Sequence, residues 1–437
     1  MKVAFRGVAR PALGKSWLVA LCLVLAAPAP VVAADVNSLG LKATYDVDAT
    51  FRWNNRTVSV DSTARVTNSS QAQVSLIAFN LATLRTGGAD LGAVTVDGTP
   101  ANVDIQDQTV HVTLPSPMPA GDDALVRIRY TATQAASPNA NGYGPGFARA
   151  NGVMTAYRWI PWLSRTTRFD NPSGGESWVT PVSSNVRVTI TTDERLTFAT
   201  SGRRVADNGL TQQFVATNVR DFNLSASQTY KSSSITVDGT KITFFYRTLS
   251  PTKVLDAARR SFRAYEANIG QYPHPQIAIS EVGPWYAIES PSLFWLPSNA
   301  SKSQLAWLVS HEMAHLWFYS TVGNDQARQP FADEAISDFM ARDLLSLWPK
   351  SQCAKADLDQ TIYDLGSCYA WVIYVQGVQW LRAYRDQVGN QAFWRGLSNY
   401  YSNYKHKIGG TRQVLDALDA AGGVSGGHED RFPSLYP

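Results

Sequence analysis

Apolar and polar residues alternate strictly from Leu41 to Arg52. A period of two over this length predicts a long strand with one buried face. Shorter runs of the same kind follow at 58–60, 94–96, 110–114, 126–130 and 186–190. Turn residues separate them, among them Asp97-Gly98 and Gly121-Asp122. Many short strands with this punctuation predict an antiparallel sandwich or saddle-like open barrel.

The hydrophobic period changes near residue 250. Asp238-Gly239 predicts a last hairpin in the β region, between 235–237 and 242–246. Ser250 and Pro251 then suit the N-cap and first turn of a helix, and apolar residues at helical spacing follow. Apart from a short strand expected at 277–282, most of the remaining chain is predicted to be helical. We therefore expect an N-terminal β domain over 35–248 and a second, α+β domain over 249–437.

The first 34 residues have the pattern of a secretory signal peptide. Four basic residues precede an apolar run from Trp17 to Ala27, and the 34 residues contain no acidic residue. Prolines and the small residues Val32-Ala33-Ala34 come next, so cleavage is expected before Asp35. An uncleaved anchor is the alternative, although the run is short for a bilayer span. The pattern predicts export to a periplasmic or extracellular compartment.

Removal of this leader changes the charge of the protein. The full chain has 39 basic and 35 acidic residues, and the leader contains four of the basic ones, which leaves 35 of each and a net charge of zero. A neutral chain without a basic stripe argues against nucleic-acid binding. No second apolar run reaches spanning length, which argues against an integral membrane protein. With 44% hydrophobic and 17% charged residues, the composition is that of a folded protein.

Two cysteines, Cys353 and Cys368, remain after the leader and its Cys22 are removed. In an exported protein such a pair most simply forms one disulfide. Two buried thiols are the alternative.

The segment from Ser301 to Ala341 contains the candidate chemistry. Ser301 and Gln304 resemble a capping box that opens a helix, and His311-Glu312-Met313-Ala314-His315 lies on that helix. Residues four apart face the same side of a helix, so His311 and His315 can bind one ion together. Glu312 lies about 100° round the helix, close enough to reach water at the metal without being a ligand.

A second helix is predicted to start near Pro330 and to carry Glu334 in its early turns. Two imidazoles and one carboxylate leave the fourth position of a Zn²⁺ ion open for water, as a catalytic site requires. Glu312 would then act as the base that takes a proton from this water. Asp338, one turn beyond Glu334, is a candidate hydrogen-bond acceptor for a ligand imidazole.

His311-Glu312-x-x-His315, eighteen residues and then Glu334 resemble the zinc signature of the aminopeptidase N family of gluzincin metallopeptidases. Other segments resemble those of this family at several places along residues 40 to 420. These are 316–318, 322–325, 331–335, the exopeptidase motif at 287–291, the tyrosine segment at 374–377, and Arg220-Asp221-Phe222. The resemblance implies an N-terminal β domain followed by a thermolysin-like, mainly helical catalytic domain that binds one Zn²⁺.

The resemblance also implies roles for residues outside the metal site. Glu289, with Ala287 and Ile288 beside it, corresponds to the segment that binds the free amine of a peptide. Tyr374 corresponds to the tyrosine that stabilises the oxyanion, and Tyr369 is the alternative.

The sequence departs from the family pattern at three motif positions. Tyr286 and Ile288 replace a glycine and a methionine, and Gln376 replaces a lysine. The chain also ends soon after Gly410, so the large C-terminal helical domain of longer relatives is expected to be absent.

These inferences predict an exported zinc aminopeptidase that removes N-terminal residues from peptides. Two other functions stay open at this point. One is an endopeptidase with the same metal chemistry and no use of the free amine. The other is a non-catalytic extracellular binding protein with a gluzincin fold.

Overall fold

The alternating segments form strands in the computed structural model, which describes residues 37–137, 146–165, 179–284, 287–424 and 426–436. The segment that begins the pattern is β1 (Lys42–Phe51), and its side chains alternate between exposed and buried as predicted. The other strands before residue 230 are β2 (Thr57–Thr67), β3 (Val74–Asn80), β4 (Asp90–Val96), β5 (Thr99–Pro100), β6 (Asn102–Gln106), β7 (Thr109–Met118), β8 (Asp123–Thr133), β9 (Phe147–Ala150), β10 (Val153–Ala156), β11 (Trp162–Leu163), β12 (Val186–Thr192), β13 (Thr197–Thr200), β14 (Arg203–Asp207), β15 (Thr211–Ala216) and β16 (Leu224–Ser227).

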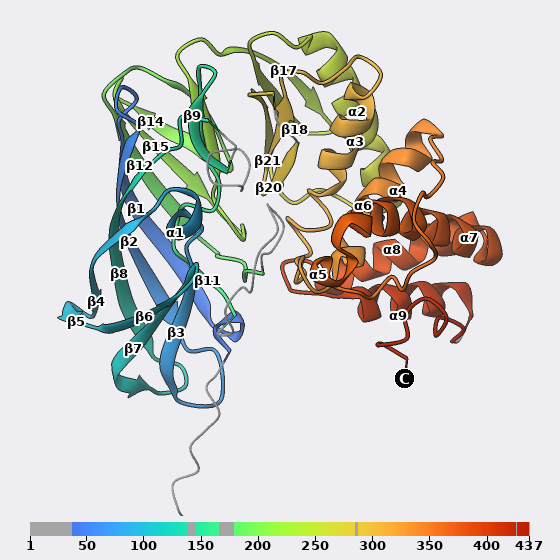
Figure 1. Cartoon of the computed structure of the whole chain (residues 1–437), viewed down its shortest axis with the longest axis horizontal. Coiled ribbons are helices and arrows are strands. Elements are labelled where there is room, and N and C mark those ends of the chain that lie inside the picture. The colour runs from blue at the N-terminus through green and yellow to red at the C-terminus, as the bar shows by residue number, and fades with distance from the viewer. Residues whose placement is uncertain (1–36, 138–145, 166–178, 285–286, 425, 437) are drawn as a thin grey trace, which may run out of the picture. The chain divides into compact units, whose positions relative to one another are not determined.

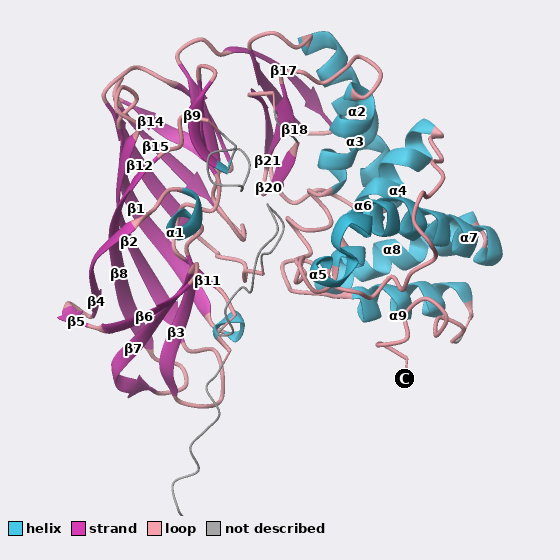
Figure 2. Cartoon of the chain, viewed as in Figure 1, coloured by secondary structure: helices cyan, strands magenta, loops and turns pink. Residues whose placement is uncertain are grey.

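These strands form three sheets around one hydrophobic core (Figures 1 and 2). The largest sheet has eight strands in the order β14-β15-β12-β1-β2-β8-β4-β5, and two four-stranded sheets have the orders β13-β16-β10-β9 and β11-β3-β7-β6. Pairing is antiparallel except between β1 and β12, which run parallel. The predicted β-sandwich is therefore confirmed for the N-terminal part.

A fourth sheet contains the strands β17 (Lys231–Val237), β18 (Thr240–Tyr246), β19 (Gln276–Val282), β20 (Ile288–Ser290) and β21 (Leu293–Pro297). Its order is β17-β18-β19-β21-β20, with β18, β19 and β21 parallel to one another. The sequence analysis grouped the hairpin of β17 and β18 with the preceding β strands, but the hairpin pairs with β19 instead. Hydrophobic period alone cannot show which sheet a strand joins, because that choice is made by contacts distant in sequence.

The helices follow mainly after residue 250 and pack on this mixed sheet and on one another (Figure 2). Their bounds are α1 (Thr83–Thr86), α2 (Pro251–Asn268), α3 (Leu305–Ala314), α4 (Glu334–Leu345), α5 (Ile362–Leu365), α6 (Tyr369–Trp371), α7 (Val378–Val388), α8 (Asn390–Tyr404) and α9 (Thr411–Gly422). The Ser250 side chain caps α2 as expected, and Pro251 occupies its first turn. Among the described residues, none of the helices is both long and apolar enough to cross a membrane.

Two groups are among the many contacts that join the β-rich and helix-rich parts. The first is a small apolar cluster that includes Tyr157 and Ala199 from the β-rich part and Ile288 and Trp295 from the mixed sheet. The second is the buried side chain of Arg220. Within the described residues these contacts belong to one compact unit, so the domain boundary at residue 248 stays a prediction.

Among the described residues, the Arg220 guanidinium donates hydrogen bonds only to backbone carbonyls. Its acceptors are the oxygens of Thr180 at 2.7 Å, Ser320 at 2.9 Å, Lys407 at 3.1 Å and Thr321 at 3.3 Å. Burial lowers the pKa of Arg220 to about 10, because no carboxylate compensates for the lost hydration. Arg220 thereby fixes the loop that follows His315 against the β-rich part.

Candidate metal centre

The two histidines of the motif lie on α3 with their rings turned toward each other. Their Nε2 atoms are 3.1 Å apart, and each lies 3.3 Å from Oε2 of Glu334. Glu334 is the first residue of α4, and Asp333 separates it from a 3-10 turn at Pro330–Ala332, so the predicted helix start near Pro330 is off by one turn. The cap of α3 also differs slightly: Ser301 accepts from Gln304 N at 3.3 Å, but the helix begins at Leu305.

The three donor atoms have the spacing of ligands around one small cation. Ligand atoms about 2.0–2.1 Å from a tetrahedral ion lie about 3.3 Å from one another. The observed separations are 3.1, 3.3 and 3.3 Å. Oε2 of Glu334 is buried and lacks a well-aligned hydrogen bond among the described residues, as expected of a ligand atom. The residues therefore fit a Zn²⁺ ion bound by two imidazoles and one carboxylate.

The electrostatics of the centre also favour a cation. Burial opposes the charged form of His311, but the carboxylates of Asp338 and Glu334, in ion-pair contact with the ring, outweigh it and raise the pKa to about 10. The pKa of His315 also rises well above its usual value, since the Glu334 charge overcomes the effect of burial. The two imidazoles in turn hold the pKa of Glu334 well below its usual range, despite its burial. A buried site that favours protonation of two imidazoles also favours a divalent cation, which can replace the two protons.

Polar groups behind the two imidazoles fix their orientation. Nδ1 of His311 lies 3.4 Å from Oδ1 of Asp338, an ion-pair contact without ideal hydrogen-bond alignment. Nδ1 of His315 lies 3.1 Å from the carbonyl oxygen of Phe318 and 3.2 Å from Oγ of Ser337. An Nδ1–H donated to such acceptors leaves the Nε2 lone pair for a metal. The structure thus places Asp338 where the sequence analysis expected it.

Glu312 lies beside this centre and is not one of the converging donors. Its side chain is buried, and Oε2 has no hydrogen-bond partner among the described residues. Burial raises the pKa of Glu312 to about 8, and the charges of Glu289 and Glu334 act in the same direction against the two imidazoles. A carboxyl group with a pKa near neutrality is suited to accept and release a proton.

Tyr374 lies against the ligand His311, with ring centroids 5.7 Å apart and an interplanar angle of 30°. It belongs to a π-helical turn, Val372–Gly377, a geometry often found at functional sites. Tyr369 contacts Tyr374, with ring centroids 5.7 Å apart. Of the two tyrosines that the sequence left open, Tyr374 is therefore the one whose ring contacts a candidate ligand.

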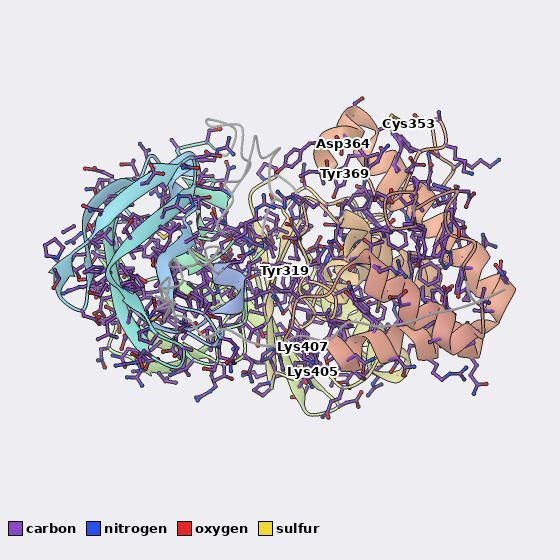
Figure 3. The ribbon with its side chains drawn as sticks, turned by 90° about the horizontal axis from the view of Figure 1, so that it is seen from below. Tyr319, Cys353, Asp364, Tyr369, Lys405 and Lys407 are labelled. Atoms are coloured by element: carbon purple, nitrogen blue, oxygen red, sulfur yellow. A yellow bond between two sulfur atoms is a disulfide. The ribbon has the colours of Figure 1, made fainter. Side chains whose placement is uncertain are left out.

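A disulfide joins Cys353, labelled in Figure 3, to Cys368, which lies six residues before Tyr374. Gln376 reinforces the link, because its Nε2 donates to the carbonyl oxygen of Ala354 at 2.7 Å and its Oε1 accepts from Ala356 N at 3.1 Å. The residue that departs from the lysine of the family pattern thus has a structural role here.

Glu289 lies in β20, the last strand of the mixed sheet, where it pairs with Phe294. Its side chain is buried, and Oε1 accepts a hydrogen bond of 2.8 Å from Nε2 of Gln326. The charge of Glu289 contributes to the pKa of Glu312 and His315, so the carboxylate lies within electrostatic reach of the metal centre. Ile288 is buried beside it, and Ala287 immediately precedes the strand.

Several residues around the centre were missed by sequence reasoning. Trp307, one turn before His311, donates to Asp338 at 2.8 Å, and Ser337, one turn after Glu334, contacts His315. Helical spacing from the ligands could have identified these two. Gln326 and Tyr319 lie in the irregular segment between the ligands, where no period indicates which side chains turn inward.

Comparison with solved structures identifies the fold. The crystal structure of an M1 zinc metallopeptidase from Deinococcus radiodurans matches with a TM-score of 0.66 and 19% identity, over 91% of this chain and 93% of that one. A mutant from the same organism, bound to a Tyr-Ser-Ala substrate, gives 0.64 and 18%, over 87% and 91%. A two-domain M1 mutant bound to L-tryptophan gives 0.66 and 19%, over 91% and 94%.

The chain therefore has the fold of M1 zinc metallopeptidases, and the resemblance seen in the sequence is confirmed at that level. No protein-family model matches the sequence, and no curated protein matches it.

Proposed function

We propose that the protein is an exported zinc aminopeptidase that hydrolyses N-terminal residues from peptides. One observation carries the proposal: the donor atoms of His311, His315 and Glu334 converge at zinc-ligand spacing with the carboxyl group of Glu312 beside them. The shared fold with M1 zinc metallopeptidases, one of them bound to a tripeptide substrate, supports peptides as the substrate class.

The residues divide the chemistry among them. His311, His315 and Glu334 would hold a zinc ion, which would supply a Lewis acid able to polarise a peptide carbonyl and acidify water. Glu312 accepts a proton from the attacking water and passes it to the leaving amine, for which its buried carboxyl group is suited. Tyr374, whose ring lies against that of His311, would supply the hydroxyl that stabilises negative charge on the carbonyl oxygen.

Glu289 supplies the exopeptidase specificity in this proposal. A peptide with a free N-terminus carries a positive charge, which a buried carboxylate binds as a charge-assisted pair. β20 is the terminal strand of its sheet, so the backbone at Ala287 and Ile288 is available to align a substrate beside Glu289. An endopeptidase would need no such carboxylate near the metal.

Export rests on two further observations. The predicted leader at 1–34 lies outside the described residues, and its composition is that of a signal peptide. The disulfide between Cys353 and Cys368 agrees with an oxidising compartment, periplasmic or extracellular. The match to a two-domain M1 structure over 94% of its length supports a β domain followed by a thermolysin-like catalytic domain.

The test uses the purified protein and a panel of aminoacyl fluorogenic substrates, with and without a chelator. We expect hydrolysis that the chelator abolishes and that added zinc restores. The same peptides with acetylated N-termini should be cleaved far more slowly. Equal cleavage of both forms would indicate an endopeptidase, and zinc binding without any hydrolysis would indicate a non-catalytic binding protein.

A further inference from the structure

Gln326 joins the carboxylate of Glu289 to the segment that carries the third metal ligand. Its Nε2 donates to Oε1 of Glu289 at 2.8 Å and to Oδ2 of Asp333, the residue before Glu334, at 3.0 Å. Both hydrogens of the amide are thereby used, one on each carboxylate. Gln326 is itself 1% exposed, so these bonds do not compete with bulk water.

Arg158 fixes which way the Gln326 amide points. Its Nη2 donates to Oε1 of Gln326 at 3.2 Å. An arginine has only donors, so this contact is satisfied only when the amide oxygen faces Arg158 and the NH₂ group faces the two carboxylates. The flip of the amide, which would turn an acceptor toward Glu289, is thus excluded by the charge of Arg158.

Arg158 is in turn held by aromatic and acidic groups. Nη2 also donates to the hydroxyl of Tyr319 at 2.5 Å, and the guanidinium lies 5.2 Å and 5.3 Å from the ring centroids of Tyr157 and Tyr319. Its Nε lies 3.4 Å from Asp221. Tyr319 has a φ of +113°, a strained conformation for a residue with a Cβ. Persistence of that strain indicates that the position of the tyrosine side chain matters.

We infer that Gln326 is a positioning residue for the proposed amine site, which sets the place of Glu289 relative to the metal ligands. The inference rests on the proposed aminopeptidase function. With Oε1 of Glu289 bound to Gln326, Oε2 has no hydrogen-bond partner among the described residues and is the atom left for a substrate amine. Because the same amide group holds Asp333, it fixes the span between amine and scissile carbonyl, and so which peptide bond is cleaved.

A second contact from the β-rich part supports the same arrangement. Nδ2 of Asn223 donates to Oγ of Ser290, the neighbour of Glu289, at 2.8 Å. Oδ1 of Asn223 accepts from the backbone N of Arg158 at 2.7 Å. Residues of the β-rich part therefore hold both Ser290, beside Glu289, and Arg158, which orients Gln326.

The inference is tested with Gln326→Met in the full-length, zinc-loaded protein. Methionine has a similar length and shape but cannot donate to Glu289 or Asp333. Cleavage of one peptide is compared in its free and acetylated forms. We expect the ratio of the two kcat/KM values to fall about tenfold or more, through a higher KM for the free-amine peptide, because loss of a hydrogen bond to a charged group has about this effect. Zinc content should not change.

Gln212→Leu is the matched control. Gln212 is also buried, donates to Leu196 O at 3.1 Å and accepts from Arg204 at 3.3 Å, but it lies in β15. The control should keep the wild-type ratio even if it loses stability. Should Gln326→Met fail to fold, Gln326→Glu decides instead, since it keeps the acceptor for Arg158 and loses the donors.

An unchanged ratio in either folded variant, with a wild type that prefers the free amine, overturns this inference alone. A wild type that cleaves both peptides equally, or neither, overturns the proposed aminopeptidase function and the inference with it.

Discussion

The candidate metal centre and the proposed amine site are built from the chain in different ways. The centre takes its ligands from one short stretch, His311 to Glu334, in which helix α3 and the start of α4 face each other. The amine site needs contacts between residues far apart: Arg158 and Gln326 are separated by 168 positions, and Glu289 and Gln326 by 37.

This difference decides what each region depends on. A helix alone brings His311 and His315 to the same side, so their geometry is set by local structure. Nothing local brings Arg158 to Gln326, so the amine site exists only once the β-rich part is docked. Catalytic chemistry and exopeptidase specificity should therefore respond differently to substitutions, and the predictions below test that separation.

The largest effect is expected from Glu312→Gln. This change removes the base but no ligand, so kcat should fall by about 10² to 10⁴ while zinc content stays near one per chain. Steady-state kinetics and elemental analysis measure the two quantities. Glu334→Ala is the contrasting variant and should lose the metal. Wild-type turnover in Glu312→Gln would show that Glu312 is not the base.

Glu289→Ala should affect specificity and leave the metal untouched. We expect the preference for free over acetylated peptides to fall by roughly ten- to a hundredfold, which corresponds to about 1.5–3 kcal/mol for a buried charged pair. Zinc content and the hydrolysis of the acetylated peptide should stay close to wild type. A parallel loss for both peptides would mean that the amine site cannot be separated from the catalytic centre.

Removal of the disulfide should have a larger effect on the stability of the fold than on the rate of turnover. The bond between Cys353 and Cys368 closes a loop with a sequence separation of 15. Loop entropy predicts about 3 kcal/mol less free energy of unfolding in the Cys353→Ser, Cys368→Ser double variant. Denaturant titration measures the change, and a reductant should destabilise only the wild type. Turnover should decline modestly as Tyr374 loses its anchor. Two alkylatable thiols in the native, unreduced protein would contradict the prediction.

The smallest effect concerns pH and a histidine outside the centre. Burial lowers the pKa of His274 from 6.5 to about 4, with a further contribution from His406 and Lys405. The unfolded chain binds a proton near pH 6.5 and the folded chain only near pH 4. The contribution of His274 to the free energy of unfolding is therefore fully present above about pH 6.5. It declines, by on the order of 1–2 kcal/mol, as the pH falls to about 4.

His274→Gln should flatten this decline in urea titrations between about pH 7 and about pH 4. The same slope in wild type and variant would assign the acid sensitivity to other groups, among them His406, whose pKa burial also lowers.

Much of the fold could be predicted, because the period of apolar residues reports which face of a strand or helix is buried. β1 and α2 have nearly the predicted bounds, and the Asp238-Gly239 turn has the positive φ values that such a hairpin needs. The sheet that this hairpin joins was assigned wrongly, since strand partners are chosen by contacts that no local pattern records.

The candidate centre shows the same limit. Ligands and their helical neighbour Asp338 could be found from spacing alone. Gln326, Asp333 and Arg158 could not, because they act through hydrogen bonds between segments without a period. Arg220 was noticed as part of a motif, but its four carbonyl acceptors became apparent only in the structure.

The backbone conformation of Tyr319 sets a limit on how this protein can change over generations. Glycine is the residue that relieves a φ of +113°, and the strain it would remove is on the order of 1–3 kcal/mol. Glycine would, however, empty the buried space that the tyrosine ring fills, and loss of a buried aromatic side chain costs about 3–5 kcal/mol. It would also delete the hydroxyl acceptor and the ring that hold Arg158. The side chain thus contributes more stability than the strain removes, so we expect this position to retain tyrosine although glycine suits its backbone better.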